Sequence, residues 1–187
     1  MDIKDKVAIV TGAASGIGQA AAKELKKHKA GAIALVDMSE AVHEIAAEIN
    51  TSNGSESVRA FQGDTTDEAF RKQVFDAMRR DYGVVNICVP AAGITRDALA
   101  VRLNKEKGKA NIYPIENFRQ VIEVNLIAPI YWALELVAQM AEDRFARGLK
   151  QWDPAEGVQG VIVFIGSVSS QGNKGQISYA TTKVGLE

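Results

Sequence analysis

A tyrosine and a lysine lie four residues apart in the segment "SYATTK" (178–183). If this segment begins a helix, Tyr179 and Lys183 lie on one face of it. Tyrosine titrates at about pH 10, so acid–base work near neutrality needs a pKa lowered by about 3 units, roughly 4 kcal/mol. A cation within about 4–6 Å supplies about 1–3 of those units. The pair suits a proton donor to a carbonyl group that hydride reduces, although the spacing alone also suits a surface pair.

Two polar residues in apolar segments favour this chemistry. Ser167 follows the apolar run 160–165, and at the carboxyl end of a parallel strand its hydroxyl can orient a substrate oxygen. Asn125 interrupts the apolar stretch "VIEVNLIAP" (121–129), where an unpaired amide would be costly. Two interpretations of Asn125 stay open: a polar core residue that bends its helix, and an anchor for a water chain to Lys183.

A glycine-rich turn, "TGAASGIG" (11–18), follows the first apolar run. Gly12, Gly16 and Gly18 lie where the chain must turn from strand to helix, and the missing side chains let backbone N–H groups approach a pyrophosphate. Tight turns also use glycine for conformational reasons alone, so the position between strand and helix carries the inference. We predict a dinucleotide site here.

Two acidic residues end the next strands of the pattern. Asp37 lies nineteen residues past Gly18, where a carboxylate accepts hydrogen bonds from a ribose 2′-OH and repels a 2′-phosphate. Neither Met38 nor Ser15 offers a cation, so NAD is favoured over NADP; the alternative is a plain turn or capping role for Asp37. Asp64, in "FQGDTT" (61–66), can similarly meet the adenine amino group, although Asp is also common in turns.

The elements that position these residues alternate along the chain. Short, almost continuously apolar runs at 6–10, 32–36, 57–61, 84–89 and 160–165 predict parallel strands covered on both faces. Between them, 17–29, 39–50, 67–80 and 115–141 predict helices, with Ser39 and Asp67 as N-caps. The pattern predicts a doubly wound α/β fold with a parallel, Rossmann-type sheet, as one domain over 1–187. Two segments, 95–113 and 147–160, are expected to be long loops.

Composition excludes several classes of protein. The net charge of −1 argues against a nucleic-acid surface, and the basic run 102–111 is expected to be a solvated loop. No stretch approaches about 18 apolar residues, and the start lacks a signal-peptide layout, so we expect a cytoplasmic protein without a membrane partner. Cys88 is expected to be a packed core thiol. His28 and His43 are expected on the surface, which argues against a hydrolase triad and a zinc site, so no metal is expected.

Taken together, the ordered set "TGAASGIG", Asp37, Asp64, Asn125, Ser167 and "YATTK" resembles the short-chain dehydrogenase/reductase family, in its single-domain branch. The resemblance implies Tyr179 as catalytic acid/base, Ser167 positioning the carbonyl or hydroxyl, Lys183 binding the nicotinamide ribose and lowering the tyrosine pKa, and Asn125 holding a relay water. It also implies further cofactor contacts, by Ser15, Ile17, Thr65, Ala92 and Gly93.

Two departures from the family pattern stand out. The sequence has "PAAG" (90–93) where the family usually shows "NNAG", so we expect a turn without the usual asparagine hydrogen bonds. Ser167 lies twelve positions before Tyr179, where thirteen is frequent. Ser169 and Ser170 are therefore competitors, although Ser167 has the better place at the strand end.

The resemblance also bears on substrate, assembly and extent. The segment "GNKGQISYATTK" is similar to 3-oxoacyl carrier-protein reductases, and 103–126 is similar to NAD-linked 3-hydroxyacyl-CoA dehydrogenases. The expected substrate is a small carbonyl or alcohol compound, such as an acyl thioester, and the expected assembly is a homodimer or homotetramer built on the helix 115–141 and the helix near Tyr179. Related chains continue further, so C-terminal strands and helices are expected to be missing. The alternative is a non-catalytic dinucleotide-binding or assembly module.

Overall fold

The structure, a computed structural model, describes residues 1–54, 56–149 and 151–187. Within them, five strands form a parallel sheet in the order β3-β2-β1-β4-β7. The strands are β1 (Val7–Thr11), β2 (Ala32–Asp37), β3 (Val58–Gln62), β4 (Val85–Pro90) and β7 (Val161–Ile162). This is the predicted α/β architecture. The last strand is shorter than the predicted 160–165, because only Val161 and Ile162 pair with β4, through Ile87 and Cys88.

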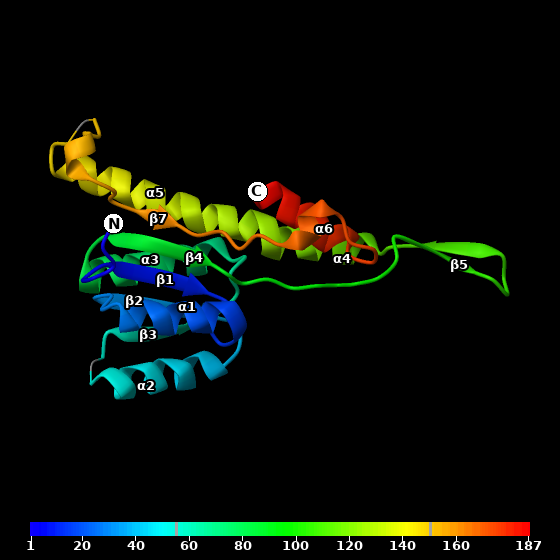
Figure 1. Cartoon of the computed structure of the whole chain (residues 1–187), viewed down its shortest axis with the longest axis horizontal. Coiled ribbons are helices and arrows are strands. Elements are labelled where there is room, and N and C mark those ends of the chain that lie inside the picture. The colour runs from blue at the N-terminus through cyan, green and yellow to red at the C-terminus, as the bar shows by residue number, and fades with distance from the viewer. Residues whose placement is uncertain (55, 150) are drawn as a thin grey trace.

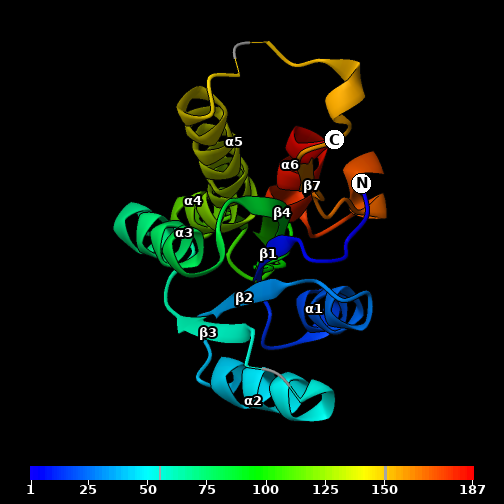
Figure 2. The ribbon, with the colours of Figure 1, turned by 90° about the vertical axis from the view of Figure 1, so that its left-hand side faces the viewer.

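Successive residues of each strand enter two separate cores, which is why the strands are continuously apolar. Ala8 and Val10 pack with α1 (Gly16–Lys27) and α2 (Ala41–Asn53), whereas Val7 and Ile9 pack with α3 (Glu68–Tyr82) and α5 (Ala128–Ala146). Figure 2 shows α1 and α3 on opposite sides of the sheet. Cys88 is fully buried in the second core, as predicted, and burial raises the pKa of its thiol to about 12.

The predicted helices agree with the structure to within a few residues, and one of the two predicted N-caps is correct. Asp67 caps α3 by accepting a hydrogen bond from Phe70 N (3.0 Å), as predicted. The predicted cap at Ser39 is wrong, because Glu40 occupies the N-cap of α2. The Ser39 hydroxyl instead accepts from Ala41 N at 3.3 Å. His28 and His43 are exposed, as expected.

The helix predicted at 115–141 extends to Ala146 in the structure and contains an irregular turn. It comprises α4 (Ile115–Ile122), the π-helical turn η1 (Glu123–Ile127) and α5. The whole helix, Ile115–Ala146, has 32 residues, and its most apolar stretch has a mean hydropathy of 1.6. By length and composition it could cross a membrane, so the expectation that no stretch approaches this length is wrong. It packs along the sheet through Trp132 and Leu136, and 39% of its most apolar stretch is buried inside the protein.

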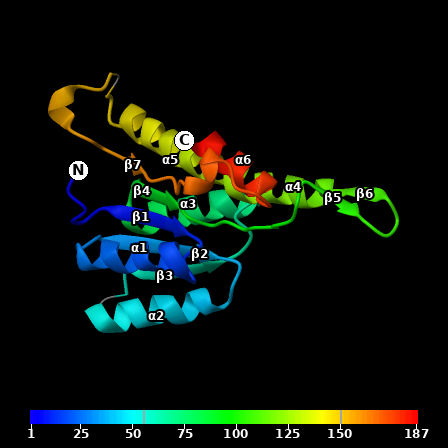
Figure 3. The same cartoon turned by 45° about the vertical axis from the view of Figure 1, so that its right-hand side comes forward.

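The two predicted loops contain regular structure. Residues 95–113 include a hairpin of β5 (Val101–Asn104) and β6 (Lys109–Ile112), which projects away from the sheet in Figures 1 and 3. Its turn is stabilised by Asn104 Oδ1, which accepts from two backbone amides, and by Gly108, whose φ is +61°. Most of the basic run 102–111 is exposed. Within 147–160, η2 (Pro154–Glu156) is a short 3-10 helix; Lys150 lies outside the described residues.

The predicted helix at the end of the chain is present as α6 (Ile177–Leu186). It follows η3 (Val168–Gln171), a short 3-10 helix whose N-cap is Ser167. Figure 1 shows α6 beside α4, and the two helices pack against each other. This placement brings the Tyr179–Lys183 pair to the side of the sheet where α4 and η1 lie.

Candidate cofactor and active site

A cavity of about 380 Å³ opens at the carboxyl ends of the central strands. It lies where the polypeptide leaves β1, β2 and β4, which is where parallel sheets bind ligands. The residues that line it are Gly12, Ser15, Gly16, Ile17, Gly18, Asp37, Met38, Thr65, Ala91, Ala92, Gly93, Ile94 and Val124. Most residues predicted from sequence to contact a cofactor are therefore brought together here.

The glycine turn at the floor of this cavity depends on close packing. Gly12 has φ +66°, and a Cβ there would lie 2.8 Å from Ala92 N. A Cβ on Gly18 would lie 2.3 Å from Gly12 O, so neither position accommodates a side chain. Gly16 differs, because φ is +54° but a Cβ would meet nothing within 4 Å. The backbone of Gly16 thus lies open at the first turn of α1, where amides lack intrahelical partners.

The "PAAG" turn after β4 is held by groups that the sequence interpretation did not identify. Thr11, 1% exposed at the end of β1, accepts a hydrogen bond from Ala92 N at 3.1 Å. This bond ties the turn to the neighbouring strand, although the usual asparagines are absent. The sequence feature that could have indicated this bond is a hydroxyl residue immediately before Gly12, at the end of an otherwise apolar strand.

The two acidic residues have different surroundings. Asp37 lines the cavity, and its carboxylate accepts from Ala14 N (3.0 Å) and Ser39 N (2.9 Å), which orients it toward the glycine turn. Asp64 is exposed and does not line the cavity; its carboxylate accepts from the backbone N–H and hydroxyl of Thr66. The structure therefore favours the turn interpretation for Asp64.

Asn125 lies in the π-helical turn and is 1% exposed. Its Oδ1 accepts from Ile94 N and its Nδ2 donates to Ile94 O, both at 2.8 Å. The π-helical turn agrees with the first interpretation, a polar core residue in an irregular helix. The second, an anchor for a water chain to Lys183, stays a prediction. Within the described part of the chain, one Nδ2 hydrogen and one Oδ1 lone pair have no other partner and can take a further one.

Tyr179 and Lys183 share one face of α6, as predicted. The Lys183 ammonium lies 5.4 Å from the centroid of the Tyr179 ring and donates to Ile165 O at 2.7 Å. Burial lowers the pKa of Lys183, and the carboxylate of Glu187 opposes this shift. A lysine ammonium with a lowered pKa therefore lies beside the Tyr179 ring.

Ser167 lies between the last strand and α6. Its hydroxyl accepts from Ser169 N at 3.2 Å, which caps η3. Its competitor Ser169 is 8% exposed, and the Ser169 hydroxyl donates to Gln176. Ser167, Tyr179 and Lys183 do not line the 380 Å³ cavity, so the structure places the predicted site residues in two groups.

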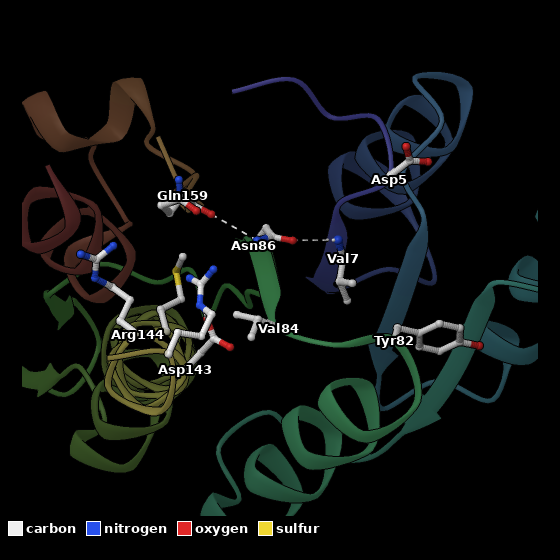
Figure 4. A pocket seen from close by; sticks show the side chains of 10 residues that line it. Asp5, Val7, Tyr82, Val84, Asn86, Asp143, Arg144 and Gln159 are labelled. Atoms are coloured by element: carbon white, nitrogen blue, oxygen red, sulfur yellow. Dashed lines mark hydrogen bonds and ion pairs between the residues drawn. The ribbon is translucent and has the colours of Figure 1, made fainter. Parts of the chain in front are cut away.

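A second cavity, of about 300 Å³, lies at the other end of the strands, near the amino ends of β1 and β4. Figure 4 shows Asn86 between Val7 and Gln159, accepting from the first and donating to the second. Arg144 at its border forms an ion pair with Glu156. The two bonds of Asn86 connect β4 to β1 and to the segment before β7. We therefore assign this cavity a structural role.

Comparison with known proteins agrees with the fold. A family profile described as "short chain dehydrogenase" matches residues 6–187. The chain belongs to the short-chain dehydrogenase family. A structure described as a short-chain dehydrogenase from Novosphingobium aromaticivorans is similar over 99% of this chain and 61% of its own, with a TM-score of 0.77 and 21% sequence identity. This likeness supports the fold.

Curated relatives share the name 3-oxoacyl-[acyl-carrier-protein] reductase FabG. The Escherichia coli K12 protein is 30% identical over 195 residues and the Thermotoga maritima protein 32% identical over 187 residues. In each case 100% of this chain aligns with 65% of the relative. The chain thus spans about two thirds of the length of these relatives.

Proposed function

We propose that this protein is a nicotinamide-dependent oxidoreductase that interconverts a carbonyl compound and a secondary alcohol. The observation that carries the proposal is the buried Lys183 ammonium 5.4 Å from the Tyr179 ring, on a helix next to a sheet whose glycine turn opens into a cavity. Membership of the short-chain dehydrogenase family supports the same reaction class.

The residues at the cavity fit a dinucleotide. Gly16 leaves open backbone at the start of α1, where partial positive charge favours a pyrophosphate. Asp37 uses one lone pair of each oxygen for backbone amides, and the other lone pairs can accept from ribose hydroxyls. A 2′-phosphate would meet this carboxylate and the exposed Met38 rather than a cation, so we propose NAD as the preferred cofactor. When bound, the cofactor supplies or accepts hydride.

The remaining groups handle the proton and the orientation of substrate. We propose that the Tyr179 hydroxyl gives a proton to the carbonyl oxygen, and that the Lys183 charge stabilises the phenolate that results. The Ser167 hydroxyl orients that oxygen by donating its hydrogen, which stays available while the hydroxyl accepts from Ser169 N. Asn125 holds the cavity wall through Ile94 and offers its free amide hydrogen to a water.

We propose a 3-oxoacyl or 3-hydroxyacyl thioester as substrate, because the curated relatives at 30% and 32% identity are named for 3-oxoacyl reduction.

We also propose that the protein forms a homo-oligomer. Tyr131, Leu134 and Val137 on α5 are each about half exposed and together form an apolar face that a second copy would cover. The molecular mass of the 187-residue chain in solution, measured by analytical ultracentrifugation, tests the proposed homo-oligomer.

The test of the function is NADH oxidation with a 3-oxoacyl thioester, comparing the wild type with Tyr179→Phe. We expect turnover that falls at least about 100-fold in the variant, since general acid catalysis contributes about 10²–10⁴-fold. Tyr82→Phe, at the end of α3, loses the same hydroxyl away from the site and should match the wild type. Binding of NADH without turnover across a panel of carbonyl compounds would instead favour the dinucleotide-binding module. NADPH preference would contradict the role given to Asp37.

A further inference from the structure

Residues 94–98, here called the 94–98 strap, connect the cavity to the start of α6. The strap leaves the turn after β4 and leads to the projecting hairpin (Figure 1). At its first residue, Ile94, both backbone polar groups are bonded to the buried amide of Asn125, at 2.8 Å each. One end of the strap is therefore fixed to the π-helical turn.

The other end of the strap is fixed to the segment that leads into α6. Ala98 N donates to Gly175 O at 2.8 Å, and Gln176 Nε2 donates to Asp97 Oδ2 at 2.9 Å. Gln176 is the N-cap of α6, three residues before Tyr179. The strap thus spans the distance between Asn125 and the helix that carries Tyr179 and Lys183.

Tyr113 completes this connection from inside the protein. It follows β6, is 9% exposed, and its hydroxyl donates to Arg96 O at 2.5 Å. The same hydroxyl lies 2.9 Å from the hydroxyl of Ser178, which is 1% exposed. Because the single phenolic hydrogen goes to Arg96 O, Ser178 must be the donor of the second bond. Tyr113 therefore bonds simultaneously to the strap and to the residue before Tyr179.

We propose that Tyr113 is a positioning residue that sets the first turn of α6, and with it Tyr179, against the 94–98 strap. The inference rests on the proposed function for its catalytic consequence. Without the phenolic oxygen, Arg96 O and the Ser178 hydroxyl lose a shared buried partner, and α6 can shift to find others. A displacement of about 1 Å at a reacting group can cost about 100-fold in rate.

The experiment compares Tyr113→Phe, Ser178→Ala and the double variant with Tyr82→Phe as control. We expect kcat to fall about 10-fold to 100-fold in each single variant, with the KM for NADH unchanged because the glycine turn is untouched. The double variant should be hardly worse than either single one, because all three lack the same bond. Amide hydrogen exchange over 177–183 should become faster in Tyr113→Phe, while that of α5 stays the same.

The outcomes separate this inference from the proposed function. If the wild type turns over and Tyr113→Phe stays within about twofold of it, the positioning role is overturned and the function stands. If the wild type shows no turnover, the function fails, and the hydrogen exchange decides the role of Tyr113. Faster exchange confined to α6 then supports the positioning role of Tyr113, and unchanged exchange overturns it. A parallel fall in kcat and in cofactor affinity would point to general loss of structure and also overturn it.

Discussion

Asn125 bonds to both backbone polar groups of Ile94, with Oδ1 accepting from the N–H and Nδ2 donating to the carbonyl, at 2.8 Å each. The two residues are 31 positions apart, so this pair of bonds joins the π-helical turn to the segment that follows β4. Because Ile94 also lines the cavity, the amide of Asn125 shapes the proposed cofactor site without reaching into the glycine turn.

Replacing Asn125 with alanine leaves the N–H and carbonyl of Ile94 without these partners, and we expect the free energy of unfolding to fall by about 2–4 kcal/mol. Asn125→Asp is the matched variant, since a protonated carboxyl group can both donate and accept. Its stability should therefore approach the wild type at low pH and be lost as pH rises and the buried group gives up its proton. Urea unfolding at several pH values checks this, and equal behaviour of both variants at all pH values would contradict it.

The sequence allowed the sheet and most of the cavity to be predicted, because those features depend on local patterns. Uninterrupted apolar runs mark buried parallel strands, and glycines between strand and helix mark the turn. The hairpin 101–112 was missed although "VRLN" and "KANI" alternate, because the basic residues of 102–111 are also typical of a solvated loop.

The contacts that organise the site could not be predicted in the same way. Thr11 and Ala92, Asn125 and Ile94, and Tyr113 and Ser178 are 81, 31 and 65 positions apart. No periodic pattern joins such residues, since only the tertiary fold brings them together. Asp64 is the opposite case, because its bonds to Thr66 are local and the turn alternative could be read from sequence alone.

The glycines at 16 and 54 offer a matched test of the cofactor cavity. Both have positive φ, +54° and +61°, and a Cβ at either would meet nothing within 4 Å. Alanine at either position should therefore cost a similar backbone strain, about 1–2 kcal/mol. Only Gly16 lines the cavity, so we expect Gly16→Ala to weaken NADH binding at least about 10-fold while Gly54→Ala leaves it unchanged. Equal NADH affinity in the two variants, by fluorescence titration, would rule out a pyrophosphate at Gly16.

Cys88 is the sole cysteine and provides a measure of binding that needs no turnover. It is fully buried in β4, and burial raises the pKa of its thiol to about 12, so the folded protein should resist a thiol-reactive disulfide at pH 8. Labelling then requires unfolding. NADH at about 100 times its dissociation constant should slow labelling about 100-fold, because it stabilises the folded state only. Rapid, stoichiometric labelling of the folded protein would show that β4 opens locally.

The ion pair of Arg144 and Glu156 should make the free energy of unfolding depend on pH between about 4.5 and 2. The hydrogen bond from Arg144, followed by that from Asp153 N, lowers the pKa of Glu156 from 4.5 to about 2. A carboxyl group with a lowered pKa in the folded state stabilises the protein fully above its unfolded value, and this contribution is lost as pH falls. The stability difference between wild type and Glu156→Gln should therefore be largest above about pH 4.5 and shrink toward pH 2. In an Arg144→Gln background the same substitution should show a much weaker pH dependence. Urea unfolding between pH 7 and 3 measures both differences, and a wild-type difference that stays constant over this range would show that Arg144 does not hold the Glu156 carboxylate in solution.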